Sequence, residues 1–136
     1  MVNWLTEDFG AAPQLMPDDI PALVAEGVTT VICNRPDAEV PPDVSSEAMR
    51  AAVEAAGLTF VDNPYTAGMP SLEQIELQGS STGKTVAYCA SGTRSTILWM
   101  LSEAKERPVD EILDRAASAG YQLGGLRGAI ESMSER

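Results

Sequence analysis

One short stretch of the sequence combines a potential nucleophile, an arginine and several hydroxyl groups. It reads "AYCASGTRSTILW" over residues 87–99 and contains Cys89, Arg94 and Ser95. A cysteine thiolate is a strong nucleophile, and a guanidinium presents a rigid fork of donors that suits an oxyanion. We interpret this segment as a candidate active site. The alternative is an ordinary strand-to-helix turn that starts with a buried cysteine, because cysteine often packs as a small hydrophobe.

The chain contains no histidine, so an imidazole cannot activate Cys89. A free thiol has a pKa near 8.5, so another feature must favour its ionisation. A strand–loop–helix turn beginning at Cys89 would direct the backbone N–H groups of residues 90–95, and the helix N-terminus, at the sulfur. We expect these N–H groups and Arg94 to hold Cys89 as a thiolate and to bind a substrate oxyanion.

Each residue of the loop has a role in this interpretation. Gly92 permits the unusual backbone dihedrals that let successive N–H groups converge. Ser95 can donate a hydrogen bond to the sulfur when it departs. The residues expected to bind substrate, mainly through their N–H groups, are Ala90, Ser91, Gly92 and Thr93.

The elements that must position this loop follow from the pattern of apolar residues. Strands are expected over 28–33, 58–61 and 85–89, and helices over 17–27, 45–57, 71–78, 95–105, 109–120 and 126–134. Strands alternating with helices predict a single α/β domain with a mainly parallel central sheet flanked by helices. Functional groups gather at the carboxyl ends of such strands, where both Cys89 and the loop 34–39 lie.

Composition narrows the possible partners and location. The 136 residues match one domain, and 20 acidic against 9 basic residues give a net charge of −11, which disfavours nucleic acid and membrane surfaces. Neither a spanning apolar run nor a signal peptide is visible, so we expect a cytoplasmic protein. Two cysteines make neither a disulfide framework nor a zinc site, and we expect no metal.

Several segments together resemble a known family. The segment "YCASGTRS", the upstream "NRPDAE", the opening "LTEDFGAAPQLMPDDIPALVAEGVTTVI" and the later "DEILDRAASAGYQLGGL" are similar to the beta-lactamase-hydrolase-like phosphatase-like domain family. The resemblance implies a bacterial protein with a protein-tyrosine-phosphatase-like or dual-specificity-phosphatase-like fold over residues 1–136. It implies a cysteine-dependent enzyme without a cofactor, acting on a small anionic substrate or a phosphorylated protein. Members are described both as phosphatases and as sulfurtransferases.

The loop departs from the tyrosine-phosphatase pattern of Cys-x5-Arg preceded by histidine. Tyr88 precedes the cysteine, and only four residues separate Cys89 from Arg94. A loop of this length resembles the single-domain rhodaneses, which carry sulfane sulfur as a cysteine persulfide. Relatives also often have arginine where this chain has Ala90. Three functions therefore stay open: a phosphatase with a phosphocysteine intermediate, a sulfurtransferase with a Cys89 persulfide, and a non-catalytic anion-binding module.

The phosphatase interpretation also needs an acid to protonate the leaving oxygen. Asp37, in the loop after the 28–33 strand, is the predicted acid, with a turn residue after Pro36 as the alternative. Asp62 is expected to point away from the site. Arg35 could bind substrate oxyanions or lie in solvent. Cys33 could form a disulfide with an oxidised Cys89 or remain an inert core residue.

Overall fold

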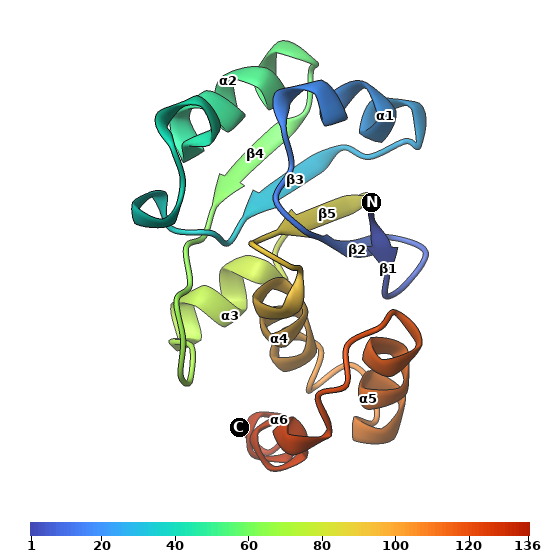
Figure 1. Cartoon of the computed structure of the whole chain (residues 1–136). Helices are drawn as coiled ribbons and strands as arrows, with labels where there is room; N and C mark the ends of the chain where they lie inside the picture. The colour runs from blue at the N-terminus through green and yellow to red at the C-terminus, as the bar shows by residue number, and fades with distance from the viewer.

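A central sheet organises the computed structural model, which describes residues 1–136. Five strands lie in the spatial order β1-β2-β5-β3-β4 (Figure 1). Their bounds are β1 (Asn3–Trp4), β2 (Phe9–Ala12), β3 (Thr30–Cys33), β4 (Thr59–Asp62) and β5 (Thr85–Tyr88). Only β1 runs antiparallel to its neighbour, while β2, β5, β3 and β4 are parallel. The predicted fold class, a mainly parallel α/β sheet, is confirmed.

Helices cover both faces of this sheet (Figure 1). One face carries α1 (Ile20–Ala25) and α2 (Ser46–Ala55), and the other carries α3 (Leu72–Gln78), α4 (Thr93–Ser102), α5 (Val109–Ser118) and α6 (Arg127–Ser134). Two apolar clusters result, one under α1 and α2 and one around α4. None of the helices combines the length and the apolar character needed to cross a bilayer.

The two central strands explain why the candidate loop is fixed in place. All four residues of β3 and all four of β5 are buried, because each strand has a parallel neighbour on both sides and helices on both faces. The apolar pattern of these segments predicts such strands. The loop that follows β5 therefore starts from the most rigid part of the sheet.

Every strand and helix predicted from the sequence is present, with ends that differ by a few residues. The capping box predicted at the start of the 71–78 helix is formed by Ser71 and Gln74. The helix after Cys89 begins at Thr93, two residues earlier than predicted. The first part of the predicted 17–27 helix is a short 3-10 turn at Pro17–Asp19.

The strands β1 and β2 are absent from the sequence-based prediction. The β2 segment reads "FGAA", and glycine and alanine are poor strand formers. The structure explains the glycine, because a Cβ on Gly10 would overlap Cγ1 of Val2 and lie 2.9 Å from Cε3 of Trp4. The packing of Trp4 over β2 thus requires a glycine at position 10. A glycine does not indicate a strand in the sequence, so the sequence does not predict β2.

Candidate active site

Cys89 follows directly after β5, at the carboxyl end of a central strand. Its side chain is 1% exposed, and the backbone N–H of Gly92 donates to Sγ at 3.1 Å. Gly92 has a φ of +97°, a left-handed conformation that residues with a side chain rarely adopt. The glycine therefore allows the tight turn that returns the backbone to the cysteine sulfur before α4 begins.

Neighbouring segments hold this loop at three points. The backbone N–H of Cys89 donates to the carbonyl of Ala12, and the carbonyl of Ala90 accepts from the N–H of Gln14, both at 3.3 Å. The hydroxyl of Tyr121 donates to the carbonyl of Ser91 at 3.2 Å. The end of β2 with the segment that follows it, and the turn after α5, thus fix the loop. The N-terminal strand that the sequence did not reveal is part of the support of the site.

Hydrogen bonds to the sulfur change the acidity of Cys89. Burial raises the pKa of the thiol, but donors outweigh burial, so the pKa lies below its ordinary value. The groups that lower it are the backbone N–H groups of Ser95, Ser91 and Gly92 and the hydroxyl of Ser95, and of these the Gly92 N–H forms a hydrogen bond to Sγ in the structure. Hydrogen bonds to the charged form stabilise it. The Ser95 hydroxyl is buried and forms no hydrogen bond in the structure, so no other acceptor would compete with the sulfur for its hydrogen.

The Arg94 side chain is held by an acidic residue that the sequence analysis did not single out. Its Nη2 donates to Oε1 of Glu39 at 2.8 Å, and its Nη1 donates to Oε2 of Glu39 at 2.9 Å and to the carbonyl of Tyr65 at 3.1 Å. These contacts occupy both Nη1 hydrogens and one Nη2 hydrogen of the five that a guanidinium carries. The Nε–H and the second Nη2–H, which lie on one edge, remain for a bound oxyanion.

Glu39 also joins the two arginines of the site. Nε of Arg35 donates to Oε1 of Glu39 at 3.3 Å, and its Nη1 donates to Oε1 of Gln14 at 3.2 Å. The hydrogen bond from Arg94 lowers the pKa of the Glu39 carboxyl and raises that of Arg94 itself. Glu39 is therefore ionised at neutral pH, and the two guanidinium groups around this one carboxylate carry one excess positive charge.

Asp37 is not placed like the other predicted site residues. Its Oδ1 accepts from the backbone N–H of Ser46 at 2.7 Å, and its Oδ2 accepts from the Ser46 hydroxyl at 3.0 Å. Both oxygens thus bind the first residue of α2, as in an N-terminal helix cap. The structure brings Arg94, Ser95 and the loop residues to Cys89, whereas Asp37 contacts a helix on the other face. Its role as the acid stays a prediction.

Cys33 lies on the side of the sheet that α1 and α2 cover. It pairs in register with Tyr88, packs in the same apolar cluster, and directs its Sγ–H to the carbonyl of Arg35 at 3.4 Å. Both cysteines are free thiols in the structure. Burial raises the pKa of Cys33, so the two thiols have opposite shifts in acidity.

These opposite shifts predict selective alkylation. We expect iodoacetamide to label Cys89 with a rate that rises with pH to a midpoint below the value of about 8.5 of a free thiol, since the thiolate is the reacting form. Cys33 should stay unlabelled in the folded protein. Peptide mass mapping after timed labelling between pH 5 and pH 9 measures both rates. Equal labelling of the two cysteines would contradict the assignment.

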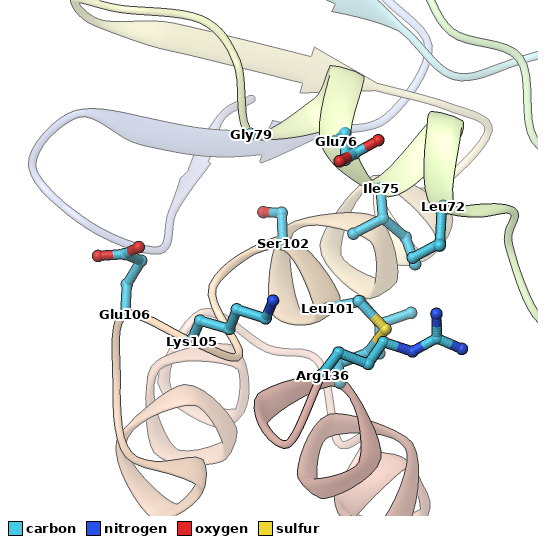
Figure 2. A pocket seen from close by; sticks show the side chains of 10 residues that line it. Leu72, Ile75, Glu76, Gly79, Leu101, Ser102, Lys105, Glu106 and Arg136 are labelled. Atoms are coloured by element: carbon cyan, nitrogen blue, oxygen red, sulfur yellow. The ribbon is translucent and has the colours of Figure 1, made fainter.

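A cavity of about 410 Å³ lies away from Cys89, between the ends of α3, α4 and α6 (Figure 2). Its floor is apolar, with Ile75, Leu101 and Met133, and its rim carries Lys105 and Arg136. The charged side chains Glu76 and Glu106 also line it, so its charge is balanced. It contains none of the predicted site residues. The candidate active site is instead the shallow loop at the N-terminal end of α4.

The domain has a mainly parallel α/β sheet, and one of its central strands leads into a cysteine loop. An arginine lies in the first turn of the next helix. This combination is that of a phosphatase-like protein with the tyrosine-phosphatase fold. The comparisons identify the family. Residues 2–106 match the family described as "Beta-lactamase hydrolase-like protein, phosphatase-like domain", and the chain belongs to this family. The resemblance inferred from the sequence is thereby confirmed.

The curated relatives carry the same family name. The chain is 28% identical over 138 residues to a beta-lactamase hydrolase-like protein of Agrobacterium fabrum, covering 96% of this chain and 32% of the relative. A relative from Xylella fastidiosa is 27% identical over 128 residues. The chain thus spans about a third of the length of the curated relatives that it matches.

Solved structures place the fold among phosphatases. A candidate phosphatase from Neisseria meningitidis Z2491 has a TM-score of 0.80 and 33% identity, with 96% of each chain covered. PTPMT1 in complex with PI(5)P has a TM-score of 0.73 with 16% identity, covering 99% of this chain and 97% of the other. The more distant likeness shows the fold alone.

Proposed function

We propose that this domain is a cysteine-dependent phosphatase that cleaves phosphomonoesters with Cys89 as its nucleophile. The observation that carries the proposal is the environment of one sulfur atom. Backbone N–H groups of Ser91, Gly92 and Ser95 lower the pKa of Cys89, and Arg94 keeps a free guanidinium edge beside it. Such an arrangement stabilises both a thiolate nucleophile and the equatorial oxygens of a transferring phosphoryl group.

The chemistry has two steps. In the first, Cys89 Sγ attacks phosphorus, an S–P bond forms, the P–O ester bond breaks, and the leaving oxygen takes a proton from water or from an acid. In the second, water attacks phosphorus, the S–P bond breaks, and phosphate leaves as Cys89 returns to the thiolate. The Ser95 hydroxyl would donate to the departing sulfur, consistent with its burial and with the absence of any hydrogen bond to it in the structure.

Charge favours a substrate with few negative groups. Arg35 and Arg94 provide positive charge at the site, whereas the whole chain has a net charge of −11. That field repels polyanions at a distance and leaves a single phosphate group as the best ligand. We propose a phosphorylated small molecule or protein as the substrate. The related fold of PTPMT1 holds a phosphoinositide, PI(5)P, which is one example of such a ligand.

A second candidate function is sulfur transfer, and a specific observation favours it. Both carboxylates of the 34–39 loop are engaged elsewhere rather than placed to protonate a leaving oxygen, because Glu39 is paired with Arg94 and Asp37 is bound to Ser46. Sulfur transfer needs no strong acid. Cys89 would attack the outer sulfur of thiosulfate, an S–S bond would form and the bond from that sulfur to the sulfonate group would break, so that sulfite leaves and Cys89 holds a persulfide. A thiol acceptor would then take the outer sulfur as its own persulfide, and Cys89 would return to the thiolate.

Two assays on one sample separate these functions. We expect the protein to release phosphate from an aryl phosphate and to show no increase in intact mass after incubation with thiosulfate. A mass gain of one sulfur atom without phosphate release would favour the sulfurtransferase. Tight binding of inorganic phosphate with neither reaction would indicate an anion-binding module and overturn both enzymatic proposals.

Asp37→Asn tests the predicted acid against the helix cap. Because both carboxylate oxygens accept hydrogen bonds from Ser46, we expect the variant to lose about 1 kcal/mol of stability. Cleavage of aryl phosphates should change little and equally for good and poor leaving groups. The measurement is a leaving-group series at fixed pH beside a urea titration. A selective loss for poor leaving groups would establish Asp37 as the acid.

A further inference from the structure

Three buried amide side chains from distant parts of the sequence meet beneath the cysteine loop. Asn34 follows β3, Asn63 follows β4 and Gln78 ends α3. Their exposed fractions are 0%, 3% and 0%. Buried amides are costly unless their hydrogen bonds are satisfied, so a cluster of three requires an explanation.

The three amides, which we call the amide triad, satisfy one another. Nδ2 of Asn34 donates to Oε1 of Gln78, and Nε2 of Gln78 donates to Oδ1 of Asn34, both at 2.9 Å. Nδ2 of Asn63 donates to Oε1 of Gln78 and to the carbonyl of Gln74, both at 3.0 Å. Nδ2 of Asn34 also donates to the carbonyl of Asn63 at 2.8 Å. Such a fully connected polar network is rigid, because each amide has only one orientation that satisfies its partners.

The amide triad bonds to the catalytic loop after Cys89, and the backbone of Asn34 bonds to the residue before it. The second Nε2 hydrogen of Gln78 goes to the carbonyl of Ser95 at 3.3 Å, in the first turn of α4. The backbone N–H of Asn34 donates to the carbonyl of Tyr88, the residue before Cys89, at 2.8 Å. Ser95 is the residue whose N–H and hydroxyl both lower the pKa of Cys89.

The amide triad also reaches the arginine of the site. The carbonyl of Asn34 accepts from the backbone N–H of Tyr65 at 2.9 Å, and the carbonyl of Tyr65 accepts from Nη1 of Arg94 at 3.1 Å. The backbone of Asn34 is thus linked to both parts of the site: through Tyr88 to the neighbouring Cys89, and through Tyr65 to the guanidinium of Arg94.

We propose that the amide triad is a positioning device that sets the distance between the first turn of α4 and the Cys89 sulfur. By fixing the carbonyl of Ser95, it holds the first turn of α4, and with it the N–H and the hydroxyl of Ser95, beside the sulfur. Gln78 is its central residue, since it alone bonds to both other amides and to α4. The inference rests on the proposed role of Cys89 as the nucleophile.

The test is Gln78→Met, which keeps the length of the side chain and removes its amide. We expect the pH midpoint of Cys89 alkylation by iodoacetamide to rise by about one pH unit, because the donors of Ser95 are no longer held at the sulfur. Val53→Ala is the matched control. Val53 is buried in the other cluster, under α2, and its truncation destabilises the fold without contacting the loop. Even if Val53→Ala lowers the melting temperature as much as Gln78→Met does, its midpoint of Cys89 alkylation should stay at the wild-type value.

The possible outcomes distinguish the two proposals. A wild-type midpoint at that of free cysteine would overturn the role of Cys89 itself. A low wild-type midpoint that Gln78→Met leaves unchanged, or that Val53→Ala shifts equally, would overturn the positioning role alone. If Gln78→Met does not fold, Asn34→Ala gives the same test, because it removes the partner that orients Gln78 and keeps the backbone bonds of residue 34. Its midpoint should rise as well.

Discussion

Cys89→Ser should reduce phosphate release from an aryl phosphate by more than about 10³-fold. The serine hydroxyl can still accept the N–H of Gly92, which bonds to Sγ at 3.1 Å in the native protein, so the loop should keep its conformation. However, an alcohol is much less acidic than a thiol. The same donors therefore leave the serine hydroxyl protonated at neutral pH. The loss should therefore appear in kcat, while inorganic phosphate still binds.

The chain offers a matched control for this variant in its second cysteine. Cys33→Ser keeps a donor for the carbonyl of Arg35 and lies on the other face of the sheet, so activity should stay within about twofold. Activity assays and urea titrations of both variants measure the two effects. If Cys89→Ser kept its activity, or if Cys33→Ser lost it, the assignment of the nucleophile would be wrong. Sulfur uptake from thiosulfate, if found, should depend on the same cysteine.

The sequence predicts most of the fold because its elements follow local rules. The segment "VTTVIC" is β-branched and becomes a strand buried on both faces, and Ser45 caps α2 as its spacing before Glu47 indicates. The strand β2 is different, because its glycine leaves room for the side chains of Val2 and of Trp4 in the neighbouring strand. Such a requirement arises only when two strands are already paired, so a local pattern does not reveal it.

The same distinction applies to the site. Cys89, Gly92, Arg94 and Ser95 lie within one loop, so the chemistry that they share is visible in consecutive residues. Glu39 contacts Arg94, which lies 55 positions away in the sequence. The sequence around Glu39 shows only a carboxylate near Asp37 and does not reveal this partner. From the sequence alone, Asp37 is preferred to Asp62 as the acid and Glu39 is not weighed, but the fold directs Asp37 to Ser46 and Glu39 to the arginines. The direction of a loop side chain depends on which helix packs against it.

Gly92→Ala should be the most damaging substitution in the loop outside the nucleophile. A Cβ at this position would overlap the hydroxyl of Tyr121 and lie 3.4 Å from the backbone carbon of Ala12. The φ of +97° adds a backbone penalty of about 1–2 kcal/mol for any residue with a side chain. Together with the steric overlap, we expect a loss of about 3 kcal/mol in the free energy of unfolding. The variant should also raise the alkylation midpoint of Cys89 and abolish phosphate release.

Two companion variants separate the causes of this loss. Gly57→Ala is the control for the backbone, because Gly57 has a φ of +83° with nothing within 4 Å of the added Cβ. It should lose only the backbone penalty and leave Cys89 unchanged. Tyr121→Phe removes the hydroxyl that the added Cβ would overlap. In the Tyr121→Phe background, Gly92→Ala should therefore cost less stability than it does in the wild-type protein. Activity should stay low in the double variant, because the N–H of residue 92 still depends on a left-handed turn that alanine disfavours. If Gly92→Ala behaved like Gly57→Ala, the close approach of Tyr121 to the loop would not matter, and the geometry of the N–H donors would not depend on this glycine.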